Sequence, residues 1–121
     1  MSGRPSGCVD LAPWRIKRAV DFIEKNLANP LHLAEIARAA GLSPMHFAAG
    51  FRSATGSSPH AYVRDRRIQC AKAKLMSDPS CIEEIALNVG FRSTTHFITV
   101  FRQITGHPPA RWRRNSTLHA T

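Results

Sequence analysis

A chain of 121 residues with 43% hydrophobic and 21% charged residues is ordinary for a globular protein, with room for one domain or two very small ones. Lys and Arg outnumber Asp and Glu by 17 to 8, and the net charge of +9 indicates a polyanionic partner, nucleic acid or acidic membrane surface, unless it only aids solubility. Cys8, Cys70 and Cys81 form no CxxC pair, and neither a membrane span nor a secretory signal is present, so we expect a reduced, cytoplasmic protein.

The spacing of apolar residues predicts helices throughout the first half of the chain. After a lead of residues 1–12, a first helix begins at Pro13 and ends at Asn29-Pro30, with the stripe Ile16, Ala19, Val20, Ile23 and Leu27. A short helix follows, with the stripe Leu33, Ile36, Ala37 and Ala40, and Gly41 ends it. Ser43 then caps a helix that opens with Pro44 and turns Phe47, Phe51 and Ala54 inward.

The second half repeats this order after a longer connecting helix. Residues 59–76 predict that helix, capped by Ser58 and about 27 Å long, with Ile68, Ala71 and Leu75 on its buried side. Ser80 and Glu83 have capping-box spacing before a short helix with the stripe Ile82, Ile85, Ala86 and Val89, which ends at Gly90. Ser93 caps a helix with Phe97, Phe101 and Ile104 inward, and Pro108-Pro109 opens a last short helix holding Trp112.

Two parts of the sequence are similar to one another. Residues 33–41 align with 82–90 at an offset of 49, and residues 46–59 align with 96–109 at an offset of 50. Eleven of the 23 aligned positions are identical, which indicates a duplicated helix-turn-helix unit. A helix about 10 Å wide fits the major groove of about 12 Å, and adjacent groove faces lie about 34 Å apart, within reach of the connecting helix and its turns. The alternative is a helical bundle without a ligand.

The residues around the second turn resemble a known family. They are Gly90-Phe91-Arg92-Ser93-Thr94-Thr95-His96-Phe97, Phe101-Arg102, Thr105-Gly106, Pro108-Pro109 and Trp112-Arg113. The first copy has Gly41-Leu42-Ser43-Pro44, His46-Phe47, Phe51-Arg52, Thr55-Gly56 and Pro59. Over roughly residues 13–114 the chain strongly resembles the DNA-binding domain of the AraC/XylS family of bacterial transcription regulators.

This resemblance implies an all-α fold: a seven-helix tandem helix-turn-helix, homeodomain-like, with two recognition helices in successive major grooves. Its partners would be double-stranded operator or promoter DNA and RNA polymerase, at the bacterial nucleoid. We expect a flexible lead (1–12), a first subdomain (13–57), a linker helix (58–77), a second subdomain (78–115) and a flexible tail (116–121). Met1 and the short lead favour a stand-alone regulator, although many relatives carry a ligand-sensing domain ahead of this one.

The helical periodicity also predicts which residues read bases. With Phe47 and Phe97 set inward, the outward faces and N-terminal tips of the two recognition helices offer Ser43, Met45, His46, Ala48, Ala49, Thr94, Thr95, His96 and Thr99. The two histidines recur in both copies, and for them a structural role is the favoured alternative. Many family members have Arg two residues after the Phe of each recognition helix, where this chain has Ala49 and Thr99, which puts strong guanine readout in doubt.

The arginines are the candidates for phosphate contacts, because their planar fork of donors suits phosphate oxygens. Arg52 and Arg102 are the first candidates because they lie late in their helices, with base contact as the alternative. The weaker ones, for which ordinary solvated charge is an equal reading, are Arg64, Arg66, Arg67, Arg92, Arg111, Arg113 and Arg114, with Lys72.

Other classes of function find little support in the sequence. It has no nucleophile elbow, P-loop or Ser/His/Asp grouping, and its six His residues show no metal-ligand spacing, so we expect no enzyme, no cofactor and no metal. We also expect no small-molecule ligand in this domain and no membrane partner. The main alternative is a non-specific architectural DNA-binding protein, which a comparison of specific and random duplex affinity would distinguish.

Overall fold

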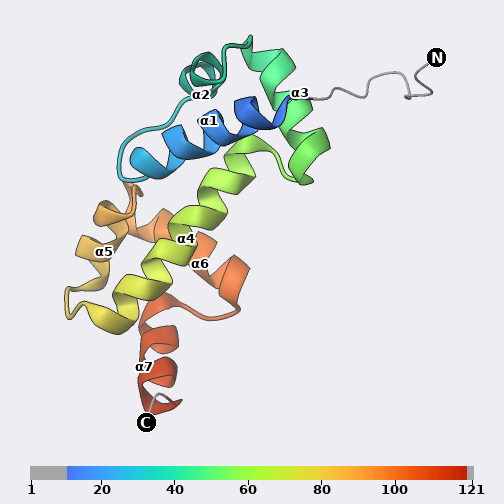
Figure 1. Ribbon diagram of the computed structural model, residues 1–121. Coiled ribbons are helices and arrows are strands. Elements are labelled where there is room, and N and C mark those ends of the chain that lie inside the picture. The colour runs from blue at the N-terminus through green and yellow to red at the C-terminus, as the bar shows by residue number, and fades with distance from the viewer. Residues whose placement is uncertain (1–10, 120–121) are drawn as a thin grey trace. The chain divides into compact units, whose positions relative to one another are not determined.

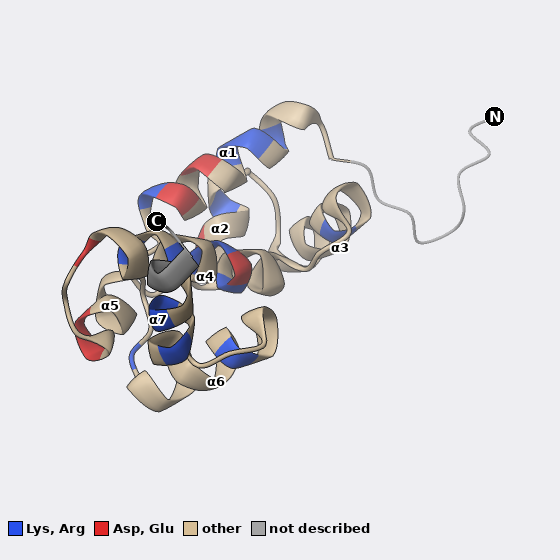
Figure 2. Cartoon of the chain, turned by 90° about the horizontal axis from the view of Figure 1, so that it is seen from below, with Lys and Arg blue, Asp and Glu red and all other residues tan. Residues whose placement is uncertain are grey.

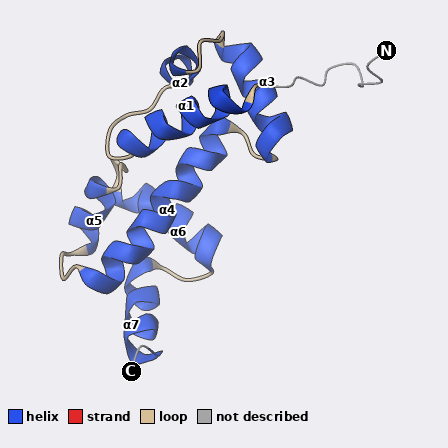
Figure 3. Ribbon diagram, viewed as in Figure 1, coloured by secondary structure: helices blue, strands red, loops and turns tan. Residues whose placement is uncertain are grey.

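The computed structural model of the protein describes residues 11–119 and consists of helices joined by turns (Figure 1). The helices are α1 (Pro13–Lys25), α2 (Leu33–Ala39), α3 (Pro44–Thr55), α4 (Pro59–Ser77), α5 (Ile82–Asn88), α6 (Thr94–Thr105) and α7 (Pro109–His119). No strand occurs in residues 11–119, as Figure 3 shows, so the predicted all-α class and seven helices are confirmed.

The chain divides into two compact units, the first ending at Val63 and the second beginning at Arg64, so that the boundary falls inside α4. Each unit contains one helix-turn-helix, α2 with α3 in the first and α5 with α6 in the second. The expected flexible lead lies almost wholly outside the described residues, since these begin at Leu11. Helix α7 continues to His119, so residues 116–119, which we assigned to a flexible tail, are helical.

In the first unit, α1, α2, α3 and the start of α4 enclose a core built on two phenylalanines. Phe47 and Phe51 of α3 are fully buried, with ring centroids 5.4 Å apart. Tyr62 of α4 meets Phe51 edge-on at 5.6 Å. Helices α1 and α2, together with the residues that directly follow them, complete the core with Ala19, Ile23, Leu27, Ile36, Ala37 and Ala40. Burial of these stripes holds α3 by its inner face and leaves its outer face open.

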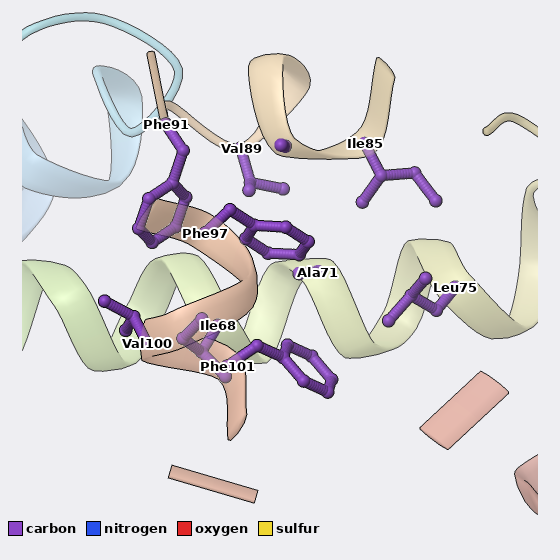
Figure 4. Close-up of a cluster of buried hydrophobic side chains, with 10 residues drawn as sticks. Ile68, Ala71, Leu75, Ile85, Val89, Phe91, Phe97, Val100 and Phe101 are labelled. Atoms are coloured by element: carbon purple, nitrogen blue, oxygen red, sulfur yellow. The ribbon is translucent and has the colours of Figure 1, made fainter. Parts of the chain in front are cut away.

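The core of the second unit repeats this plan (Figure 4). Phe97 and Phe101 of α6 are fully buried, and their ring centroids lie 5.7 Å apart. They pack with Val100 of α6 itself and with residues of α4, α5 and the turn that follows α5, namely Ile68, Ala71, Leu75, Ile85, Ala86, Val89 and Phe91. Trp112 of α7 packs against this cluster from outside.

The turns between the paired helices follow from their glycines. Gly41 has φ of 76° and Gly90 has φ of 103°, which ends α2 and α5 as predicted. The next residue in each turn, Leu42 or Phe91, donates its N–H to the carbonyl five residues back, at 3.0 Å and 2.9 Å. This is the Schellman pattern, in which an apolar residue after the glycine packs back onto the helix. Phe91 is accordingly buried, which we had not predicted.

Three residues predicted to face the core are exposed instead. Ala54 and Ile104 occupy equivalent positions in the last turns of α3 and α6, and both face solvent. Their phase on the helix is as predicted, but the last turn of each helix leaves these side chains exposed. Leu33, the first residue of α2, is also exposed, because it lines a hollow of about 190 Å³ with Ala48 and His60 rather than packing in the core.

The predicted capping box of α5 was wrong by one residue. The N-cap is Cys81, whose N–H donates to the Glu84 carboxylate at 3.4 Å, and not Ser80 with Glu83. His32 and Glu35 form the equivalent pair at the start of α2, also at 3.4 Å. Cys and His are uncommon at N-caps, so the sequence pattern favours the nearby Ser. The hydroxyl of Ser80 instead donates to Asp78 at 2.6 Å.

Candidate nucleic-acid interface

The two recognition helices, α3 and α6, begin in the same way. The Ser43 hydroxyl accepts the N–H of His46 at 3.3 Å, and the Ser93 hydroxyl accepts the N–H of His96 at 3.2 Å, which confirms both predicted caps. Each cap satisfies one of the free N–H groups of the first turn and fixes where the helix begins. In this arrangement the Ser43 hydroxyl is already engaged by the backbone, and this limits it as a base reader.

The outward face of α3 is almost free of polar donors near its tip. Met45 is 84% exposed, and His46 and Ala49 are also exposed, while Ala48 is half-buried beside the hollow. Methionine and alanine offer methyl groups to a neighbouring surface but no hydrogen bonds. Among the exposed side chains Met45, His46 and Ala49, only His46 has nitrogen atoms that can form hydrogen bonds to a base.

The outward face of α6 carries hydroxyl groups at the equivalent positions. Thr95 and Thr99 are exposed, and Thr94 is half-buried. The Thr99 hydroxyl donates to the Thr95 carbonyl at 3.0 Å, which leaves its oxygen lone pairs as acceptors. The ring of His96 lies edge-on to Phe91, 5.6 Å between centroids, so this exposed histidine packs on the turn with one side and faces solvent with the other.

Acidic residues are absent from both recognition helices. The sequence has no Asp or Glu between Glu35 and Asp65, and none after Glu84. Figure 2 shows the same distribution: α3, α6 and α7 carry basic residues without acidic ones, whereas α1, α4 and α5 carry acidic residues. Arg52 and Arg102, in the last turns of α3 and α6, are exposed. The reading faces are therefore open to a polyanion without like-charge repulsion.

The other predicted phosphate residues differ in how far they are engaged within the protein. Arg92, Arg111 and Arg114 are exposed, and Arg64 is exposed but pairs with Asp65 at 3.3 Å. Three more are half-buried: Arg66, Arg67 and Arg113. Burial lowers the pKa of the Arg67 guanidinium below its ordinary value, although an arginine so placed stays protonated at neutral pH. The exposed group is the better placed for contacts with a partner.

One arginine that we had not selected lies against the turn of the first helix-turn-helix. Arg15 of α1 donates to the carbonyls of Ala40, at 2.5 Å, and Gly41, at 3.2 Å. Its guanidinium also stacks on the ring of Trp14, 4.4 Å from the centroid. Arg15 therefore supports the turn that precedes α3. Its position two residues after Pro13 gave no signal of this role, since the contact spans 25 residues of sequence.

Within residues 11–119, no group of three or more His, Cys, Asp or Glu side chains could hold a metal ion. Over the same described part of the chain, none of the helices combines the length and the hydropathy needed to cross a membrane.

Comparison with known proteins decides the family. A family model described as a helix-turn-helix domain matches residues 36–115. The bifunctional transcriptional activator/DNA repair enzyme AdaA of Bacillus subtilis is 33% identical over 101 residues, covering 84% of this chain and 48% of that protein. A Chromobacterium violaceum regulator described as AraC-type is 28% identical, with a TM-score of 0.78 over 83% of this chain and 89% of that one. The chain belongs to the AraC/XylS family of transcription regulators.

A second solved structure bears on the site. The DNA-binding domain of AdpA, solved in complex with a target DNA, is 27% identical, with a TM-score of 0.81 over 84% of this chain and 92% of that one. The predicted tandem helix-turn-helix fold is thereby confirmed, and the match is to a family of DNA-binding regulators and not of enzymes. The chain spans 48% of AdaA, so the similarity concerns the DNA-binding region and not the repair activity in that protein's name.

Proposed function

We propose that this chain binds specific sequences in double-stranded DNA through α3 and α6 and regulates transcription at the promoters that contain them. The observation that carries the proposal is the pair of duplicated, acid-free recognition helices, each held by two buried phenylalanines and each with its outer face exposed. An apolar inner face and an open outer face are what the major groove requires of a docked helix. The similarity to the DNA-binding domain of AdpA, which was solved in complex with a target DNA, supports DNA binding.

In this proposal α3 and α6 enter successive major grooves. Helix α4, which joins the two units, has 19 residues and is roughly 28 Å long at about 1.5 Å per residue. Adjacent groove faces on one side of B-DNA lie about 34 Å apart, a span that such a helix and its flanking turns can cover. A binding site of two half-sites one helical turn apart follows.

The roles of individual residues follow from their exposure. Met45 and Ala49 of α3 contact thymine methyl groups, while Thr95 and Thr99 of α6 form hydrogen bonds to base edges. Phosphates are contacted by the exposed arginines of α3, α6, α7 and the turn before α6, namely Arg52, Arg92, Arg102, Arg111 and Arg114. Phosphate contacts set the register on the duplex, and base contacts supply the sequence preference.

RNA polymerase is the protein partner that we propose, by analogy with regulators of the AraC/XylS family. Such a complex would form on chromosomal DNA, at the nucleoid. A promoter-bound regulator needs a surface that the DNA leaves free, and α5, which is not a recognition helix, carries the exposed acidic residues Glu83 and Glu84.

Selection of binding sites from a random duplex library with the full chain tests the proposal. A regulator enriches a defined sequence with two half-sites and binds it at least about 1,000-fold more tightly than random duplex. An architectural protein enriches no sequence and binds all duplexes within a few-fold of one another. That second result would replace the proposed function with the architectural one.

A further inference from the structure

A proline near the end of α4 leaves one buried carbonyl without its usual donor. In an α-helix the carbonyl of residue i accepts the N–H of residue i+4, so the carbonyl of Leu75 would pair with residue 79. Residue 79 is proline, which has no N–H. Leu75 is only 2% exposed, so water has little access to its carbonyl, and another donor is needed.

Arg113 of α7 supplies that donor. Its Nε donates to the Leu75 carbonyl at 2.9 Å, and its Nη2 donates to the carbonyls of Asp78 at 2.8 Å and Ser80 at 3.0 Å. The guanidinium is planar, so Nε and Nη2 present their hydrogens along one edge in a fixed geometry. One side chain thereby joins the end of α4, the loop that follows it and α7.

The loop that Arg113 holds is also fixed from within. The Asp78 carboxylate accepts the N–H of Ser80 at 2.9 Å and its hydroxyl at 2.6 Å. These two hydrogen bonds hold the pKa of the Asp78 carboxyl below its ordinary value, with smaller contributions from Lys74 and Arg113. The carboxylate is charged at neutral pH, and the loop leads after Ser80 directly into α5, the first helix of the second helix-turn-helix.

The neighbour of Arg113 contacts the recognition helix itself. The indole of Trp112 meets the Phe101 ring of α6 edge-on, with 5.7 Å between centroids. Two consecutive residues of α7 therefore contact the two helices of the second helix-turn-helix, α6 directly and α5 through the loop before it. Trp112 thus packs on α6, and Arg113 fixes the loop from which α5, the supporting helix, begins.

The first unit shows that this arginine is not required by the fold alone. At the positions equivalent to Trp112 and Arg113 it has Tyr62 and Val63, and Val63 is buried. The equivalent proline, Pro30, deprives the carbonyl of Asn26, but the N–H of Asn29 donates to that carbonyl at 2.9 Å. In the first unit, a donor within the turn itself pairs with the carbonyl that the proline leaves without a partner. In the second unit, Arg113 provides that donor.

We propose that Arg113 is a positioning residue for the recognition helix α6, and that it does not contact a DNA phosphate. The proposal rests on the proposed function, because its consequence is read in the sequence preference of the second half-site. Arg113 then has a structural role, although its charge alone places it among the candidate phosphate contacts.

The test compares Arg113→Lys and Arg113→Ala with Arg114→Ala, a matched change at the exposed neighbour. Lysine keeps the charge but loses the planar edge that reaches three carbonyls, so we expect it to behave like alanine. Both Arg113 variants should lose at least about fivefold in discrimination against a duplex altered in the second half-site, the share that one base pair commonly provides. Discrimination in the first half-site and the salt dependence of binding should stay as in the parent chain.

Arg114→Ala should do the reverse, weakening binding evenly across duplexes and flattening the slope of log K against log salt by about 0.9. The fluorescence of Trp112, isolated in a Trp14→Phe background, gives a readout without DNA: it should shift to the red in both Arg113 variants and stay unchanged in Arg114→Ala. Parent-like discrimination in Arg113→Lys, or a flattened salt slope in Arg113→Ala, overturns the positioning role. A parent chain that selects no sequence defeats the proposed function instead, and with it this inference.

Discussion

The indole of Trp112 stands against the ring of Phe101 with 80° between the ring planes, an edge-to-face contact in the second unit. In the first unit Tyr62 meets Phe51 at 76°, at the equivalent positions. Each recognition helix is thus held by an aromatic residue from the helix that follows it. Such pairs add about 0.5–1.5 kcal/mol beyond the area they bury. The second phenylalanine of each recognition helix is therefore both fully buried and part of such a pair.

Replacement of that phenylalanine should therefore be costly. Phe101→Ala removes a fully buried ring, and we expect it to lower the free energy of unfolding by about 3–5 kcal/mol, as should Phe51→Ala. Ile104→Ala is the matched control in the same helix, because Ile104 is 38% exposed, and it should cost under about 1 kcal/mol. Urea denaturation followed by circular dichroism measures both. Equal costs for Phe101 and Ile104 would refute the assignment of the core face of α6.

Salt should weaken binding steeply, because the proposed contacts release counterions from DNA. About five phosphate contacts, made by the exposed arginines, give a slope of log K against log salt near −4.5. Arg102→Ala should make that slope shallower by about 0.9. Lys17→Ala is the control, since Lys17 lies on α1 and pairs with Asp21 at 3.3 Å. A parent slope flatter than about −2, measured by fluorescence anisotropy, contradicts the electrostatic account.

The two units should read DNA unequally. The exposed Met45 and Ala49 of α3 cannot form the bidentate hydrogen bonds that discriminate bases by about 1–3 kcal/mol each, whereas Thr95 and Thr99 of α6 offer hydroxyl groups. The selected site should carry most of its information in the half under α6, with the other half read through thymine methyls or DNA shape.

Two substitutions check this inequality in opposite directions. Ala49→Arg should create a new preference in the first half-site, and Thr95→Ala should blur the second. Site selection repeated with each variant gives the answer. Information concentrated in the first half-site, together with no loss of specificity when Thr94, Thr95 and Thr99 are each replaced by Ala, would point to His46 as the principal reader.

The turn before α3 should be more sensitive than the turn after it. Gly56 has φ of 81° with open space where a Cβ would stand, so Gly56→Ala should cost about 1–2 kcal/mol for its left-handed backbone alone. Gly41 has φ of 76°, and an added Cβ would lie 2.8 Å from Nη1 of Arg15. That side chain can move, but it then gives up its hydrogen bonds to the turn, so Gly41→Ala should cost more.

A double-mutant cycle isolates the contribution of Arg15. In an Arg15→Ala background the Cβ at position 41 meets no guanidinium, and Gly41→Ala should then cost about as much as Gly56→Ala. Thermal unfolding of the parent chain, the two single variants and the double variant, with Gly56→Ala for comparison, supplies the measurement. If the cost of Gly41→Ala is the same with and without Arg15, the contact carries no coupling and the explanation fails.

Acid should remove the contribution of Asp78 to stability. Its pKa is lower in the folded chain than its ordinary value of about 3.9, so the ionised form stabilises the fold above that value. The contribution is lost as the pH falls from about 4 through the lower pKa of the folded state. Asp78→Asn should thus melt below the parent at pH 7, and the two melting temperatures should converge towards pH 2. A gap that persists unchanged to pH 2 would show that the charge of Asp78 plays no part.

The sequence by itself determined the helices, the duplication and the family, because each rests on local or repeated patterns. Gly41, Gly90, Ser43 and Ser93 mark turns and caps through backbone chemistry that depends on nearby residues only. The buried phenylalanines followed from the helical period. The outward residues of α3 and α6 followed from the same period, and exposure agrees for most of them.

Tertiary structure decided what the periodicity could not express. Ala54 and Ile104 have the correct phase but lie beyond the ends of their cores, and only the packing shows where a core ends. Arg15 and Arg113 are indistinguishable in sequence from solvated arginines. The carbonyls that bind them lie 25 and up to 38 residues away in the chain. A carbonyl becomes buried without a donor only when the helices pack together. The need to satisfy such carbonyls gives Arg15 and Arg113 their structural roles.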